Sequence, residues 1–180
     1  MGTGRGLGYT LSMTALILFS HGSVLCGAGE AVDAHAARLR ASVASGEHGD
    51  WDLVEVGYLN YSEPRFLDTV AKVAAAGATR VVVVPYFLVA GYFVQVDLPR
   101  CLDAARAAHP HIEFVAADAL RHDAGLADAL LDAALHARPA ERWREPLERA
   151  AASCRARPEC PLYATPACPR VPAREEAATG

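Results

Sequence analysis

Arg80-Val-Val-Val-Val-Pro-Tyr-Phe-Leu88 is an almost unbroken run of β-branched and aromatic residues, and Thr14-Ala-Leu-Ile-Leu-Phe-Ser20 is equally apolar at successive positions. A strand with one face in water alternates between apolar and polar residues, whereas a strand buried on both faces does not. Strands buried in this way are typical of parallel sheets that helices cover on both sides. The two runs therefore predict two parallel strands of such a sheet.

Two more apolar runs, Trp51 to Leu59 and Ile112 to Ala117, complete a set of four predicted strands. Patterns of helical period separate the four strands. The first lies within Glu30 to Ser45, where apolar residues recur at intervals of three and four. Strands that alternate with helices predict right-handed crossovers. We therefore expect an α/β fold in three layers, a four-stranded parallel sheet with helices on both faces.

Residues that favour helix ends mark the other three predicted helices. Ser62 can cap the second helix, with Pro64 in its first turn, where no amide donor is needed. Gly77 can end this helix in a left-handed conformation. Asp97 and Asp123 are the predicted caps of the third and fourth helices.

The composition excludes several classes of protein. The chain has 180 residues, of which 52% are hydrophobic and 21% charged, and a net charge of −4. These values exclude a disordered chain or a collagen, and they argue against a nucleic-acid partner, which requires a basic face. Seven of the eleven prolines fall after residue 137. We predict a flexible leader over 1–12, an α/β domain over 13–137 and a Pro/Cys-rich tail over 138–180.

The start of the chain resembles an export signal only superficially. The apolar run that begins at Leu11 is interrupted by His21 and Gly22, and Leu25 precedes Cys26 where signal cleavage needs a small residue. No stretch has the roughly 18 apolar residues of a membrane span. We expect a cytoplasmic protein with no membrane contact, whose five cysteines are free thiols or metal ligands.

Ligands of open parallel sheets bind beyond the carboxyl ends of the strands, so the residues after each strand are the candidate site. His21 ends the first strand and precedes the small residues Gly22 and Ser23. Its imidazole can hold a divalent metal or move a proton near neutral pH, or it can merely fix the strand–helix turn through a hydrogen bond. No Gly-x-Ser-x-Gly motif surrounds Ser23, so serine hydrolysis is disfavoured.

The loop after the third strand is the second candidate. Gly91 permits close backbone approach or an unusual φ, and the rings of Tyr92 and Phe93 follow it. Two aromatic rings beyond the carboxyl end of a strand can bind a flat conjugated ligand by stacking. The same rings could instead form a dimer contact or a hydrophobic plug.

Three stretches together resemble the sirohydrochlorin chelatases: Leu16-Ile-Leu-Phe-Ser-His-Gly-Ser23, Val54-Glu-Val-Gly-Tyr-Leu-Asn-Tyr-Ser-Glu-Pro64, and Val84-Pro-Tyr-Phe-Leu-Val-Ala-Gly-Tyr-Phe-Val-Gln-Val-Asp-Leu-Pro99. The resemblance covers roughly Met13 to Ala137. It implies a chelatase-like α/β fold, often a homodimer. It also implies a lyase-class metal chelatase that inserts divalent Co, Ni or Fe into a tetrapyrrole, as in cobalamin or siroheme synthesis, and releases two protons.

The resemblance makes His21 the catalytic residue and a metal ligand, and it assigns substrate contacts to Gly22, Ser23, Gly91, Tyr92 and Phe93. Two positions depart from the family. Phe93 stands where the family usually has a second histidine, and Asn60 where it often has a glutamate. A single imidazole is a poor divalent-metal site, because such metals take several ligands.

These departures leave alternatives open. The chain could complete its ligand set with Glu63, Tyr92 or a partner subunit, or it could bind a tetrapyrrole or metal without catalysis. A third reading is an iron–sulfur or redox protein on the same fold. It rests on the tail, where thiolates could hold a cluster or zinc, with Cys101 among the residues that could complete the set. The cysteines of the tail are Cys154, Cys160 and Cys168.

Overall fold

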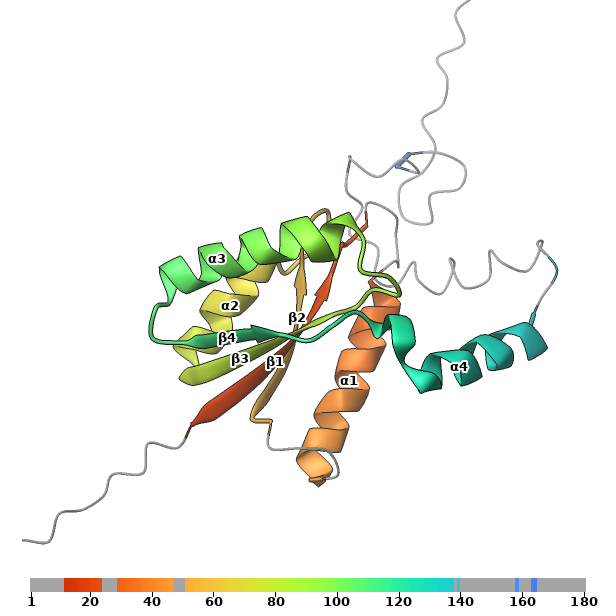
Figure 1. The fold of residues 1–180 in the computed structure, drawn as a ribbon, viewed down its shortest axis with the longest axis horizontal. Helices are drawn as coiled ribbons and strands as arrows, with labels where there is room; N and C mark the ends of the chain where they lie inside the picture. Colours follow the sequence, from red (N-terminus) through yellow and green to blue (C-terminus); the bar gives the residue numbers. More distant parts are fainter. Residues whose placement is uncertain are drawn as a thin grey trace, which may run out of the picture.

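The computed structural model describes residues 12–23, 29–46 and 51–137, together with residues 139, 158, 163 and 164. Within these ranges the chain alternates between strands and helices, as its pattern predicts (Figure 1). The elements are β1 (Met13–Ser20), α1 (Glu30–Ser45), β2 (Leu53–Tyr58), α2 (Phe66–Ala75), β3 (Ala78–Pro85), the π-helical turn η1 (Phe93–Asp97), α3 (Leu98–Ala108), β4 (Glu113–Ala116), the 3-10 turn η2 (Leu120–His122) and α4 (Ala124–Leu135).

All strand pairs are parallel, and the sheet has the order β2-β1-β3-β4. Helix α1 lies on one face of this sheet, and α2 and α3 lie side by side on the other (Figure 1). The predicted α/β class, the four parallel strands and the helices on both faces are thereby confirmed. The two continuous apolar runs form β1 and β3, which are the two central strands.

Strand β1 shows why its sequence does not alternate. Ile17 and Phe19 point into the core beneath α2 and α3, where both are fully buried. Leu16 and Leu18 point the other way, into the core beneath α1. Because successive side chains of a strand project to opposite faces, a strand covered on both sides needs an apolar residue at every position.

Helix α4 is the exception to the layered arrangement. It extends away from the sheet (Figure 1), and none of its described side chains is buried. Leu130, Leu131 and Leu135 are 60, 66 and 84% exposed. Its predicted cap is confirmed, because the Asp123 carboxylate accepts a hydrogen bond from the amide of Gly125 at 2.8 Å.

The predicted start of α2 is wrong, whereas α3 begins after Asp97 as predicted but without the capping bond. Helix α2 begins at Phe66, and the Ser62 side chain lies against Ser23 instead of capping the helix. Pro64 also precedes the helix, and its carbonyl accepts from the amide of Tyr58 at 2.9 Å. The segment therefore continues the pairing along β2 before it turns into α2.

At the start of α3, the Asp97 side chain makes no capping hydrogen bond, because η1 runs directly into the helix and the backbone is already helical there. At the end of α2, Gly77 does adopt the predicted left-handed conformation, with φ +97°. None of the helices in the described ranges is both long and apolar enough to cross a membrane.

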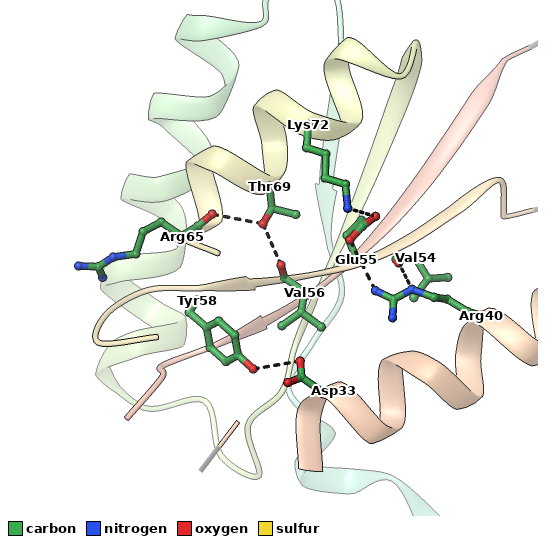
Figure 2. A network of polar contacts seen from close by, with 9 residues as sticks. All are labelled: Asp33, Arg40, Val54, Glu55, Val56, Tyr58, Arg65, Thr69 and Lys72. Atoms are coloured by element: carbon green, nitrogen blue, oxygen red, sulfur yellow. Dashed lines mark hydrogen bonds and ion pairs between the residues drawn. The ribbon is translucent and has the colours of Figure 1, made fainter. Parts of the chain in front are cut away.

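Side chains from the helices satisfy outward-facing carbonyls of the edge strand β2 (Figure 2). Arg40 of α1 donates from Nε to the carbonyl of Val54 at 2.8 Å. The Thr69 hydroxyl of α2 donates to the carbonyl of Val56, also at 2.8 Å, and Thr69 is 1% exposed. Unpaired edge carbonyls attract further strands, so these contacts blunt the edge.

The other edge strand, β4, is treated in the same way. Arg106 of α3 donates from Nη2 to the carbonyl of Phe114 at 3.2 Å. Glu55 ties the two helices beside β2 together, since its carboxylate lies 2.6 Å from Lys72 Nζ of α2 and 3.5 Å from Arg40 Nη2 of α1 (Figure 2). The sheet edges and the helix layers are thus linked by side chains that reach the backbone or one another.

Thr69→Val tests the buried contact of this edge. Valine has nearly the same shape but no hydroxyl, so the carbonyl of Val56 loses its donor in a buried place. We expect a loss of about 1–3 kcal/mol in the free energy of unfolding, measured by urea denaturation. Thr79→Val is the matched control, because the Thr79 hydroxyl is exposed, and a change within about 0.5 kcal/mol is expected there. Equal losses in the two variants would contradict this account.

Candidate functional site

The segments that follow β1 and β2 run side by side past the carboxyl edge of the sheet. The amide of Leu59 donates to the carbonyl of Ser20, and the amide of Asn60 donates to the carbonyl of His21, each at 2.8 Å. These two bonds continue the parallel pairing beyond both strands. The backbone of His21 is therefore held as firmly as a residue of the sheet.

Gly22 makes this close approach possible. Its φ is +82°, and a Cβ atom built on it would lie 1.8 Å from the carbonyl oxygen of Asn60. A side chain at this position would push the two segments apart and strain the backbone. Gly22, predicted as a substrate contact, therefore has a packing reason of its own.

Ser23 and Ser62 join the same two segments one step further along. The amide of Ser23 donates to Ser62 Oγ at 3.1 Å, and that hydroxyl lies 3.4 Å from the carbonyl of Ser23. The sequence does not reveal this role of Ser62, since no local pattern shows that two loops 39 residues apart touch.

The His21 side chain is held through one of its two ring nitrogens. Nδ1 lies 3.0 Å from the carbonyl oxygen of Gly22. A carbonyl can only accept a hydrogen bond, so the contact places a proton on Nδ1. In the neutral ring, Nε2 is then the nitrogen with the lone pair. The predicted turn-fixing hydrogen bond is present, and it leaves the imidazole able to bind a metal or accept a proton at Nε2.

Two aromatic rings contact this imidazole. The ring centroid of Phe93 lies 4.1 Å from that of His21, and the centroid of Tyr61 lies 5.7 Å away in an edge-to-face arrangement. Phe93 also stacks on Phe87 at 6.0 Å, and Phe87 contacts the buried Phe19 at 6.1 Å. A row of rings thus connects the hydrophobic core to the candidate site and fixes the position of Phe93.

The segment after β3 contributes exposed apolar surface beside the rings of His21 and Phe93. Tyr92 is 61% exposed, and its ring lies 6.3 Å from that of Phe93. Leu88 and Val89 are also exposed. The unusual φ expected of Gly91 is absent, and a Cβ there would meet no protein atom within 4 Å, so its predicted substrate contact stays a prediction. The Gly91 carbonyl accepts a hydrogen bond from the backbone amide of Gln95 at 2.9 Å, at the start of η1.

Few metal ligands accompany His21. Within the ranges 12–23, 29–46 and 51–137, no three His, Cys, Asp or Glu side chains are grouped so that they could hold a metal ion. Cys154, Cys160 and Cys168, the predicted ligands of the tail, lie outside the described residues. Cys101 is half-buried and packs on the core, where burial, and to a smaller extent Asp97, raise the pKa of its thiol. A raised pKa disfavours the thiolate that a metal or cluster requires.

Asp118, which follows β4 at the same edge, has a structural role. Its carboxylate accepts from Arg121 at 2.7 Å and from the amide of Ala119 at 2.8 Å. These hydrogen bonds lower the pKa of Asp118, and the bond from Arg121 has the larger effect. The group therefore stays ionised near neutral pH and does not serve as a proton carrier there.

The fold defines the class of protein. A solved sirohydrochlorin chelatase, SirB from Bacillus subtilis subspecies spizizenii in complex with cobalt, aligns with a TM-score of 0.62 and 18% sequence identity. The alignment covers 78% of this chain and 61% of that one. At this identity the likeness shows that the two chains share the chelatase-type fold.

The family follows from sequence. The CbiX family model matches residues 15–137, so this chain belongs to the CbiX family. Sirohydrochlorin cobaltochelatases from Methanococcus aeolicus and Methanopyrus kandleri are each 36% identical over 90 residues, which is 50% of this chain. The match spans 59% of the length of both relatives.

Gly22→Ala and Gly91→Ala form a matched pair for this site. The first places a methyl group against the Asn60 carbonyl at a positive φ, and the second places one in open space. We expect Gly22→Ala to lower the free energy of unfolding by about 2 kcal/mol or more, through strain and overpacking. Gly91→Ala should change it by less than about 0.5 kcal/mol. Thermal and urea denaturation measure the stability of both variants. A Gly22→Ala variant as stable as the unaltered protein would contradict the close contact between Gly22 and the Asn60 carbonyl.

Proposed function

We propose that this protein is a sirohydrochlorin chelatase, which inserts a divalent metal ion into the free-base tetrapyrrole. The observation that carries the proposal is the placement of His21 in a chain of the CbiX family. Its imidazole stands at the carboxyl edge of the sheet, with Nδ1 held by the Gly22 carbonyl and Nε2 available for chemistry. The curated relatives named above are cobaltochelatases for sirohydrochlorin, and cobalt is therefore the first metal to test.

The reaction requires the macrocycle to lose the protons of two pyrrole N–H groups while the metal ion binds its nitrogens. His21 Nε2 can accept one proton at a time and pass it to solvent, or it can hold the incoming ion through the same lone pair. The rings of Tyr92 and Phe93 offer apolar surface on which a flat macrocycle can stack. In this proposal Gly22 and Ser23 keep the imidazole at the correct place beneath the substrate.

Phe93 is compatible with this proposal, although it replaces a potential ligand. Its ring lies nearest to His21, where a second histidine would also meet the imidazole. With phenylalanine there, the protein supplies aromatic surface instead of a second metal ligand. The nitrogens of the macrocycle can then provide the other ligands of the metal ion as it leaves the protein.

The finer expectations extend this proposal. We propose a cytoplasmic homodimer whose product enters cobalamin or siroheme synthesis, with cobalt, nickel or ferrous iron as the metal substrate. The division into 1–12, 13–137 and 138–180, and a cluster or zinc on the cysteines of the tail, stay predictions.

His21→Ala tests the central residue. Loss of the only imidazole that we assign to the reaction should lower the rate of cobalt insertion into sirohydrochlorin by about 100-fold or more, as for other proton-transfer residues. The change in absorbance of the macrocycle measures the rate. His111→Ala is the matched control, because His111 is exposed at the other end of the sheet, before β4. Binding of sirohydrochlorin without any insertion by the unaltered protein would instead indicate a non-catalytic tetrapyrrole carrier.

Phe93→His tests the geometry of the pair. An imidazole at position 93 would lie beside His21 and give the site a second nitrogen ligand. We expect the affinity for Co²⁺, measured by calorimetry without macrocycle, to rise about tenfold or more. Phe93→Leu keeps the site apolar and should bring no gain. Equal cobalt affinity in the two variants would show that position 93 does not face the metal.

A further inference from the structure

Tyr61 adopts a backbone conformation that its residue type disfavours. Its φ is +58°, in the left-handed region, where a bulky side chain with a Cβ atom is rarely found. Such strain persists only where the surroundings enforce it, and it is concentrated at functional sites. The strained conformation of Tyr61 therefore points to a functional role for this residue.

The surroundings of Tyr61 do enforce the conformation. On one side, the amide of Asn60 is bonded to the carbonyl of His21. On the other side, the amide of Ser62 donates to the carbonyl of Asn60 at 2.6 Å, and the Ser62 hydroxyl is bonded to Ser23. With residues 60 and 62 both bonded to residues 21–23 after β1, the chain can pass through position 61 only by this tight turn.

The turn presents the Tyr61 ring at the candidate site. Tyr61 is 50% exposed, and its ring meets the His21 imidazole edge-on, at 5.7 Å between centroids and 63° between planes. A half-exposed aromatic residue that already contacts the imidazole can offer apolar ring surface to a ligand there. Tyr92, on the segment after β3, offers a second exposed ring near the same cluster.

We propose that Tyr61 contacts the tetrapyrrole directly and determines how tightly and in which position the macrocycle sits over His21. This inference rests on the proposed chelatase function. The aromatic ring supplies the contact, and the strained turn already holds that ring beside the His21 imidazole, which lowers the entropic cost of binding when the substrate arrives. Tyr61, in the segment after β2, is thus a substrate-binding residue distinct from Tyr92 and Phe93, the proposed contacts in the segment after β3.

Three substitutions separate the ring from the turn. Asparagine tolerates the left-handed conformation, so Tyr61→Asn removes the ring and keeps the backbone. Tyr61→Gly also removes the ring and relieves the strain, so the protein should be at least as stable as before. Tyr61→Phe keeps the ring and removes only the hydroxyl.

The measurements are the Kd of sirohydrochlorin without metal, from the quenching of protein fluorescence, and KM and kcat for cobalt insertion. We expect Tyr61→Asn and Tyr61→Gly to raise Kd and KM about 3- to 10-fold, the worth of one aromatic contact, with kcat within about twofold. Tyr61→Phe should retain most of the affinity. Unchanged Kd and KM in both ringless variants would overturn the inference, and so would a fall in kcat alone, which would mean that Tyr61 only positions His21.

The design distinguishes this inference from the proposed function. If the unaltered protein binds sirohydrochlorin but inserts no metal, the chelatase proposal fails, and the Kd of the variants still decides the role of Tyr61. If the protein inserts cobalt and the variants match it, the proposal for Tyr61 alone fails. If the unaltered protein does not bind sirohydrochlorin at all, both are overturned.

Discussion

The burial of β1 on both faces is the constraint on which the rest of the structure depends. Ile17 and Phe19 fill the core beneath α2 and α3, while Leu16 and Leu18 fill the core beneath α1. A strand anchored in two cores at once can neither slide nor rotate, because a shift of one residue would exchange its two faces and its pairing with both neighbours. His21, which directly follows β1, is therefore held at a fixed position at the sheet edge.

The segments that follow β1 and β2 build the candidate site around His21. Beyond β1 and β2 the two chain segments stay bonded to each other as far as Ser23 and Ser62, and at Gly22 they lie too close together for a side chain. Rigid backbone of this kind allows one imidazole to be held through Nδ1 alone. The same tightness accounts for the disfavoured conformation of Tyr61.

The chemistry around His21 is aromatic rather than acidic. Phe93 and Tyr61 are its ring neighbours, and the row Phe93–Phe87–Phe19 ties the site to the core. Such surroundings favour a flat conjugated ligand over a tightly bound metal ion, because rings stack on rings whereas metals need several donor atoms. This agrees with the proposed chelatase function, in which the metal ion is a substrate and the flat macrocycle stacks on the rings.

The sequence by itself determined the α/β class, the order of strands and helices, and the position of His21 just after the first strand. Those features depend on hydrophobic period and on strand ends, which are local patterns. Local patterns failed where the tertiary surroundings decided the role of a residue. Ser62 looks like a helix cap but is bonded to Ser23, and Gly91 looks like a special turn but lies in open space. Only the tertiary structure decided that Phe93 and Tyr61 meet His21, because those contacts join segments from three different strands and no periodicity along the chain encodes the distance between them.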